Sequence, residues 1–461
     1  MPNQPLALDE QAMVQAASDS TTTPEELLRI ANYLALVADP DFERPTSGTD
    51  FLRFIGRQGP LAVVLEPHPR TAIVAALVAN PNTPQKTLLH FAADFPEAFL
   101  ANPVLLLLLL EHPDLFRQMD ELRLLVFLRH PAIPLNLLNT IRGYASPDVA
   151  QAIAYHINSY SEAGADWQAQ AEALVAQLAL PPVDGQEALI EHLALGTLPA
   201  WLEQRLRASN EEHIQQALQQ TVTVLEDEVF AAMSYTVNHE RFDLATIATA
   251  DRELRKLAAE SSDPEILRLL ADDDDPSVRA RVAFNINTPL EVLPSLELDD
   301  VQPVRNALAL NPNVPTALLA TMARDYSWSA LRMRKAIAQH PNVTPDILAR
   351  LATDESIQVR NAVVRNKQTS ASARQQLLDR ALTAALYSAH PMFHFIAMAN
   401  QYTNPDHLRK GLRSPYWYAR YALALNPAVP LEIISELAND AHCFVRRAAQ
   451  TVLEQRAKEQ A

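Results

Sequence analysis

Six arginines recur at a fixed place in a repeated pattern in the second half of the chain. They are Arg279, Arg305, Arg334, Arg360, Arg420 and Arg446. An acidic residue stands six positions before four of them, as in Asp273/Arg279, whereas Ser414 has that place before Arg420. A guanidinium group can bind a carboxylate or a phosphate through two parallel hydrogen bonds. Because Asp and Arg recur together, we predict that this arginine column forms structural ion pairs; the alternative is a line of cationic groups that binds a partner.

Aromatic residues gather where the pattern is stretched, in "DYSWSALRMR" and "SPYWYARYALA". These segments supply Tyr326, Trp328, Tyr416, Trp417, Tyr418 and Tyr421, in a chain with only 6% aromatic residues. Adjacent residues of a helix face different directions, so we expect some of these rings in the core and others outside. An exposed Trp or Tyr is a frequent anchor of protein interfaces. We therefore predict that the six include the contacts of a partner-binding surface.

Other residue types that could do chemistry have unsuitable spacing. The acidic run at residues 272–275 lacks the Gly and the spaced carboxylates of a calcium loop. His390 and His394 have a spacing that zinc uses on helices, but Pro391 disturbs the helix and the Glu of a protease motif is missing. Nucleophile elbows, phosphate loops and dinucleotide-binding motifs are not found in a chain with 8 glycines. We expect no catalytic residues, no metal and no cofactor.

The arginines belong to a repeat of about 25 residues, of which "VRNALALNPNVPTALLATMA" is one copy. Arg precedes Asn by six positions in Arg279/Asn285 and Arg305/Asn311, and the same spacing returns around residues 360 and 420. This period is long enough for two short helices and two turns. Asn-Pro ends one helix, since the residue before Pro leaves the helical region and Asn tolerates the left-handed conformation; a second Pro starts the next helix.

The acidic turn, "VRxAxAxNPxxP" and "LLxxLA" together resemble the leucine-rich repeat variant family and, more distantly, HEAT-like repeats. The resemblance covers residues 260–450. It implies an all-α fold, an α-solenoid in which each repeat pairs an α-helix with a shorter helix and the copies stack into a right-handed superhelix. Some members of the family carry a cysteine-rich iron–sulfur domain. This chain has one cysteine, Cys443, so we do not expect that domain here.

The pattern changes along the chain and predicts three regions. Residues 1–144 keep the Pro punctuation without the arginines, as in "ALVANPNTPQKTLLHFA", and are expected to be degenerate helical repeats. Residues 145–255 lose the punctuation but keep helical spacing of apolar residues. We interpret them as diverged helical pairs that continue the array; the alternative is an insert or a separate helical domain. Residues 256–461 are expected, from the resemblance, to form the leucine-rich-repeat-variant array.

The net charge of −17 is concentrated in the first part of the chain. Residues 1–260 hold 34 acidic and 16 basic residues, whereas residues 261–461 hold 21 and 22. Such a field disfavours nucleic acid and favours basic partners. The start "MPNQPLALDE" does not resemble a signal peptide, and the apolar run at residues 104–110 is too short to cross a membrane. We expect a soluble, cytoplasmic protein that makes no membrane contact.

These observations favour a noncatalytic scaffold for protein–protein interaction, which binds a protein or an extended peptide on the surface of the solenoid. The main alternative is a nucleic-acid-binding HEAT-like solenoid of the DNA-repair glycosylase type, which would need a basic concave face and a buried catalytic carboxylate. A third possibility is an enzyme with its site within residues 145–255.

Overall fold

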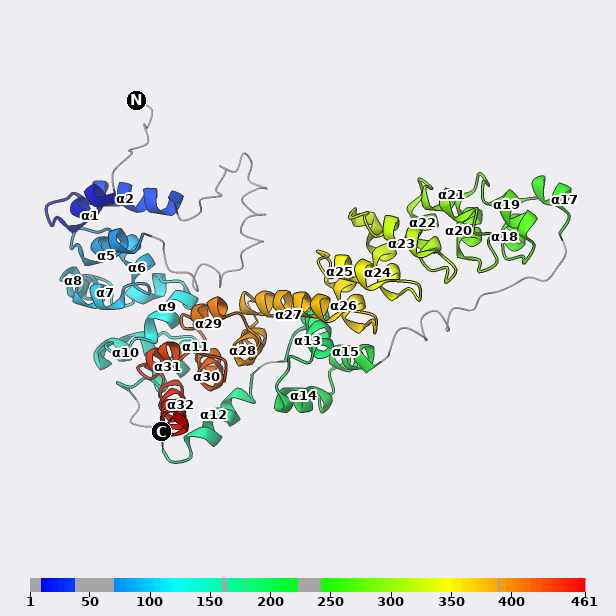
Figure 1. Ribbon diagram of the computed structural model, residues 1–461. Coiled ribbons are helices and arrows are strands. Elements are labelled where there is room, and N and C mark those ends of the chain that lie inside the picture. The colour runs from blue at the N-terminus through cyan, green and yellow to red at the C-terminus, as the bar shows by residue number, and fades with distance from the viewer. Residues whose placement is uncertain are drawn as a thin grey trace, which may run out of the picture. The chain divides into compact units, whose positions relative to one another are not determined.

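The computed structural model describes residues 10–37, 70–159, 164–178, 180–222, 242–388 and 390–460. In these residues the regular elements are helices, and one isolated antiparallel β-bridge joins His156 to His442 (Figure 1). The fold is therefore all-α, as the sequence predicts. The chain divides into two compact units: unit 1 comprises residues 1–179 and 382–461, and unit 2 comprises residues 180–381. None of the described helices is long and apolar enough to cross a membrane.

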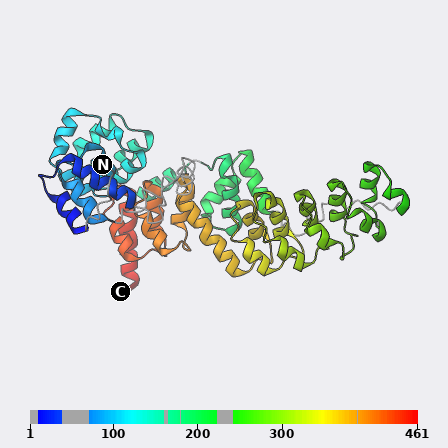
Figure 2. The same ribbon diagram turned by 90° about the horizontal axis from the view of Figure 1, so that it is seen from above.

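Unit 2 contains a row of helices that pack in order along the chain. Helix α20 contacts α22, α22 contacts α24, and α24 contacts α26, while shorter helices lie between them (Figures 1 and 2). The helices of this unit are η2 (Val183–Gly185), α13 (Gln186–Leu195), α14 (Ala200–Arg207), α15 (Glu212–Val222), α17 (Leu244–Ala248), α18 (Arg252–Ala258), α19 (Pro264–Leu270), α20 (Pro276–Phe284), α21 (Leu293–Glu297), α22 (Gln302–Leu308), α23 (Thr316–Met322), η3 (Trp328–Ala330), α24 (Leu331–Gln339), α25 (Pro345–Leu351) and α26 (Ile357–Arg365).

Unit 1 combines helices from both ends of the chain, and α27 (Ala371–Leu386) crosses from unit 2 into it. Its N-terminal helices are α1 (Glu10–Ser18), α2 (Pro24–Val37), α5 (Thr71–Ala79), α6 (Gln85–Phe91), α7 (Pro96–Ala101), α8 (Val104–Glu111), η1 (Leu115–Gln118), α9 (Glu121–Leu128), α10 (Leu135–Arg142), α11 (Pro147–Ala154) and α12 (Trp167–Val175). Its C-terminal helices are α28 (Pro391–Ala399), α29 (Pro405–Gly411), α30 (Trp417–Leu425), α31 (Leu431–Leu437) and α32 (Cys443–Gln460). Backbone hydrogen bonds join the two sets, from the Cys443 N–H to the Tyr155 carbonyl and from the Ala441 N–H to the Arg129 carbonyl, both at 3.0 Å.

Prolines and asparagines set the helix boundaries, with one correction to the predicted geometry. Pro264 and Pro345 occupy the first turn of α19 and α25, where the missing N–H costs nothing. The asparagines that end α20 and α30, Asn285 and Asn426, have φ near −70° and ψ near +124°. The expected left-handed conformation is therefore wrong, because both asparagines take an extended conformation at the helix end. Pro427 requires this of Asn426, whereas Asn285 adopts the same backbone before Ile286. Among the described residues, Gly196 alone has a positive φ.

A ladder of buried amide side chains ties successive repeats together. The amide of Asn311 donates to the carbonyls of Ala283 and Asn285 at 2.9 and 2.8 Å, and its oxygen accepts the N–H of Asn313. His340 does the same with an imidazole, since its Nε2 bonds the Asn311 carbonyl at 2.8 Å. The ladder supplies partners for carbonyl groups near helix ends. It recurs in both units, including the N-terminal region without repeat arginines, at Asn80, Asn102, Asn285 and Asn426.

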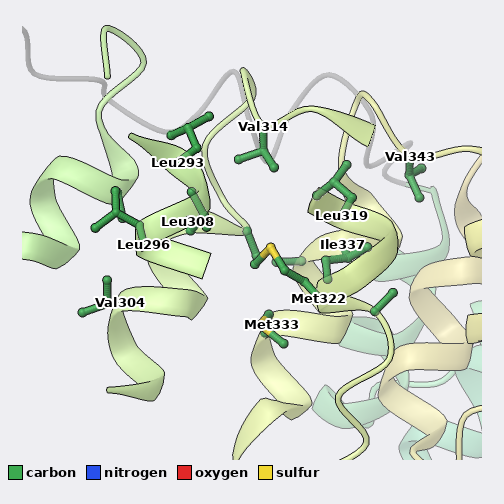
Figure 3. Close-up of a cluster of buried hydrophobic side chains, with 14 of the residues drawn as sticks. Leu293, Leu296, Val304, Leu308, Val314, Leu319, Met322, Met333, Ile337 and Val343 are labelled. Carbon is green, nitrogen blue, oxygen red and sulfur yellow. The ribbon is translucent and has the colours of Figure 1, made fainter. Parts of the chain in front are cut away.

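The core of unit 2 lies between successive helices of the row. Val304 and Leu308 of α22, like Met333 and Ile337 of α24, are four residues apart and fully or almost fully buried. That spacing places each pair on one face of its helix. Figure 3 shows the cluster they form with residues of the intervening helices and turns, namely Leu293, Leu296, Val314, Leu319, Met322 and Val343.

The region at residues 145–255 is divided between the two units. Helices α11 and α12 belong to unit 1, whereas α13, α14, α15, α17 and the start of α18 belong to unit 2, where α13 packs against α26 and against α15. The compact units separate at 179/180 and 381/382, whereas the regions drawn from the sequence pattern meet at 144/145 and 255/256. The difference arises because helices that are distant in the sequence pack together.

Candidate functional site

Three guanidinium groups of the arginine column in unit 2, those of Arg279, Arg305 and Arg334, each contact two successive acidic turns. Arg279 donates to both carboxylate oxygens of Asp299, at 2.5 and 3.1 Å, and its third nitrogen donates to the Asp273 carbonyl at 2.7 Å. Arg334 likewise binds the Asp354 carboxylate at 2.6 Å and the Asp325 carbonyl at 2.8 Å. The acid of the preceding turn, six positions before Arg279 and nine before Arg334, thus supplies a carbonyl, and the carboxylate comes from the next repeat. A Ser can precede Arg420 because that contact needs only the backbone.

Arg360 and Arg446 depart from this pairing, whereas Arg420 follows it. Arg360 binds Glu191 of α13 through both carboxylate oxygens, at 2.9 and 3.4 Å, so α13 takes the place of the next repeat. Burial raises the pKa of Glu191, and the hydrogen bond and charge of Arg360 oppose that rise. In unit 1, Arg420 binds Asp440 at 2.7 and 3.1 Å. Arg446 donates to the Asp440 and Ala441 carbonyls and forms no ion pair within the described residues.

These contacts link four turns of unit 2 in succession. The turns contain Asp273, Asp299, Asp325 and Asp354, and we call them the turn row. Ion pairs from Arg255, Arg279, Arg305 and Arg334 connect them to the preceding repeat, the weakest being Arg305–Asp325 at 3.9 Å. Each of these arginines also donates a hydrogen bond to a backbone carbonyl in the turn or loop that precedes its own helix. Each arginine therefore connects the turn before its helix to the turn of the next repeat.

Large apolar side chains are exposed on the turn row. Trp328 is 86% exposed, Leu298 79% and Tyr326 53%. The ring of Tyr326 lies 5.7 Å from the Arg334 guanidinium, so one of its faces contacts a residue of the same unit. Trp328 is the first residue of the short helix η3, which directly precedes α24. Its side chain is exposed, whereas Ala330 of the same helix is buried in the core. Of the six predicted aromatic contacts, Tyr326 and Trp328 are accessible to a partner.

Exposed carboxylates accompany these side chains. Asp272, Asp274 and Glu355 are exposed and make no ion pair within the described residues, and the exposed Asp300 lies 3.8 Å from Arg279. The two exposed cations Arg324 and Arg332 flank Trp328 in the sequence. The turn row therefore presents an indole ring between acidic turns, with positive charge limited to the vicinity of Trp328.

The aromatic cluster at residues 416–421 is a correction to the predicted surface. Trp417, Tyr418 and Tyr421 are 6%, 9% and 3% exposed, and Tyr416 is half-buried. Helix α30 is packed between α28 and α32, and the Trp417 indole stacks on His442 with 4.5 Å between ring centres. Its Nε1 donates to Gln151 of α11 at 3.1 Å. The neighbouring helices cover the rings of Trp417, Tyr418 and Tyr421. These three residues therefore cannot serve as exposed anchors of an interface.

The two candidate metal segments do not assemble a ligand set. His390 caps α28, its Nδ1 accepting the Met392 N–H, whereas His394 is fully buried and neither ring nitrogen has a hydrogen-bond partner among the described residues. Asp273 and Asp275 of the acidic run bind Arg255 and Arg252. Within the described ranges, no three His, Cys, Asp or Glu side chains are placed to hold a metal ion.

Sequence reasoning missed two members of the turn-row contacts. Arg255 lies 24 residues before Arg279 and pairs with Asp273 at 2.6 Å, so the repeat spacing alone could have identified it. Glu191 carries no such signal, because it comes from a segment without the repeat pattern. A comparison of the chain with protein-family models finds no match, and a comparison with curated proteins finds none either.

Proposed function

We propose that the chain is an α-solenoid of leucine-rich repeat variant type that acts as a noncatalytic, cytoplasmic scaffold for protein–protein interaction. Three features of the described residues support the architecture: the ordered packing of α20, α22, α24 and α26, the amide ladder, and the arginine–aspartate pairs that join each repeat to the next. Repeats that contact mainly their neighbours form long surfaces suited to extended partners.

The proposed binding surface is the turn row of unit 2. The observation that carries this proposal is the 86% exposure of Trp328 on a surface with unpaired carboxylates. An exposed indole loses much unfavourable contact with water when a partner covers it, and its face attracts Lys and Arg side chains. Carboxylates at Asp272, Asp274 and Glu355 add a preference for positive charge. The partner is therefore a basic segment of a protein or peptide that also carries apolar residues.

A random peptide library tests this proposal directly. Peptides selected on the immobilised protein at moderate salt should be enriched in Lys or Arg together with apolar residues. For the best of them, Trp328→Ala should raise the Kd measured by fluorescence anisotropy about tenfold or more, as expected for an interface anchor. Tyr402→Ala is the matched control, because Tyr402 is 58% exposed but belongs to unit 1.

Two results would contradict the proposal that the turn row is the binding surface. One is a set of selected peptides that bind the Trp328→Ala variant as tightly as the original protein. The other is preferential binding of nucleic acid whose affinity falls steeply between low and physiological salt, which would indicate contacts dominated by phosphates.

A further inference from the structure

A small cavity in unit 1 lies among α9, α11, the start of α30 and the start of α32. Its volume is about 30 Å³, and its lining includes Arg129, Gln151, Trp417, Tyr418 and His442 together with one carboxylate, that of Asp148. A water molecule needs about 10 to 15 Å³ of such volume, so the cavity has room for roughly two oxygen atoms. It is too small for a nucleotide or a sugar, and it could hold the head of a small polar group.

The positive charge in this cavity is only partly balanced. Arg420 is neutralised by its two hydrogen bonds to Asp440. Arg129 donates to the Leu412 carbonyl and forms no ion pair in the described part of the chain. Burial and the charge of Arg420 lower the pKa of Arg129 to about 10, so it remains protonated at neutral pH. Arg129 is half-buried, and a partly desolvated cation without a carboxylate partner is costly; an anion in the cavity would relieve that cost.

Neutral hydrogen-bond donors accompany the cation. The Gln151 side-chain oxygen accepts the Trp417 Nε1–H at 3.1 Å, which leaves the Gln151 amide as a donor. The pKa of Tyr418 is raised by burial, so its hydroxyl is protonated at neutral pH and can also donate. The stacked rings of Trp417 and His442 form a wall, and burial lowers the pKa of His442 well below its ordinary value, which keeps that ring neutral.

We propose that this cavity binds a carboxylate group, with Arg129 as its cationic partner and Gln151 and Tyr418 as neutral donors. The planar guanidinium matches the two oxygens of a carboxylate, and the size of the cavity admits those two oxygens. The exposed Asp148 also lines the cavity and disfavours a doubly charged phosphate. The carboxylate comes from a small free acid or from the end of a peptide chain. This site involves no residue of the turn row, so it is independent of the function proposed above.

Thermal unfolding of the full chain in matched salts tests the proposal. At equal pH and ionic strength, sodium acetate at about ten times its Kd should raise the Tm by roughly 3 °C relative to sodium chloride. N-acetylglycine represents the end of a peptide, and N-acetylglycinamide is its control without a carboxylate. A rise with acetate alone assigns the cavity to a small acid; a rise with N-acetylglycine and not with its amide assigns it to a chain end.

Variants show whether the response arises in this cavity. Arg129→Met should abolish the rise in Tm, and Arg129→Lys, which keeps the charge without the planar fork, should reduce it. Arg142→Met is the matched control, because Arg142 is an exposed arginine of the same unit, and it should respond like the original protein. The proposal is overturned by equal Tm values in acetate, N-acetylglycine and chloride, by an equal or larger rise with phosphate, or by an undiminished response of Arg129→Lys.

Discussion

The ion pairs of the arginine column differ in burial, and burial decides what each contributes to stability. Arg334 and Asp354 are 6% and 0% exposed, whereas Arg305 and Asp325 are 22% and 35% exposed with 3.9 Å between their charged groups. Removing one partner of a buried pair leaves a charge without compensation, which costs about 3–5 kcal/mol. An exposed pair contributes about 1 kcal/mol or less.

We therefore expect Arg334→Met to lower the free energy of unfolding by about 3–5 kcal/mol and Arg305→Met by about 1 kcal/mol. Urea unfolding followed by circular dichroism measures both. The double variant Arg334→Met/Asp354→Leu should recover a large part of the loss, because it leaves neither charge buried. Similar losses for the two single variants would show that burial does not set the contribution of these pairs.

Buried His394 makes stability depend on pH. Its ring lies edge-on to Tyr416, and burial lowers the pKa of His394 to about 3. Above pH 6.5 the ring is neutral in the folded and the unfolded chain and contributes no pH dependence. As the pH falls below 6.5, the unfolded chain takes up a proton that the folded chain does not bind until about pH 3. Stability therefore falls by about 1.4 kcal/mol per pH unit in that range.

His394→Leu removes this titration and a buried ring whose nitrogens have no partner in the described residues. We expect the variant to be at least as stable as the original protein at pH 7, and its relative stability to increase at pH 6 and again at pH 5. Denaturant unfolding at the three pH values measures the difference. Parallel stability curves for the two proteins would contradict the assigned role of His394.

At the scale of single residues, the sequence predicts which groups recur together but not which are buried. The recurrence of Asp with Arg predicts their association, and the structure adds that the carboxylate comes from the next repeat. Trp328 and Trp417 lie in similar aromatic segments, yet one is exposed and the other is covered by His442 and Gln151. His442 directly precedes α32 and Gln151 belongs to α11, and no local pattern reveals the positions of these two helices around α30.

At the scale of elements, the amide ladder joins each helix end to the preceding repeat. Asn311 is fully buried and makes three hydrogen bonds with backbone groups. We expect Asn311→Leu to lower the free energy of unfolding by roughly 2–4 kcal/mol, because it leaves the Ala283 carbonyl and the Asn313 N–H without their partner and removes one of the two donors to the Asn285 carbonyl. Asn311→His should be tolerated better, since His340 fills the equivalent position with one donor and one acceptor. Urea unfolding compares the variants, and equal losses for Leu and His would contradict the hydrogen-bonding role.

The helix pattern itself was largely predictable, because proline leaves few alternatives at a helix boundary. The alternation of two short helices around the second Pro appears as predicted in α19/α20 and α25/α26. The error concerned the backbone of the asparagines. An Asn at a helix end can serve two purposes: it tolerates a left-handed backbone, and its side chain can bond the preceding repeat. The sequence pattern does not distinguish the two, and the structure shows the second.

At the scale of the whole molecule, the order of packing is not the order of the sequence. In unit 2, α26 is followed along the chain by α27, yet α13 packs against α26 and supplies Glu191 to Arg360. The sequence of residues 180–222 lacks the repeat pattern, so its place beside α26 could not be predicted. We infer that α13 to α15 cap the row of helices in unit 2, as terminal repeats do in arrays of this kind.

This capping role predicts a difference between two fragments of the chain. Residues 180–381 contain the row and its cap, and should unfold as one cooperative helical unit. Residues 243–381 lack the cap, which exposes the face of α26 that packs on α13 and leaves the buried Arg360 without its carboxylate; we expect a lower Tm and a tendency to aggregate. Circular dichroism with thermal unfolding, together with light scattering, compares the fragments.

In the longer fragment Glu191→Gln should lower the Tm by less than removal of the whole cap, because it removes the charge pair but keeps the packing of α13. Equal Tm values for the two fragments would mean that α13 to α15 rest on the row without stabilising it.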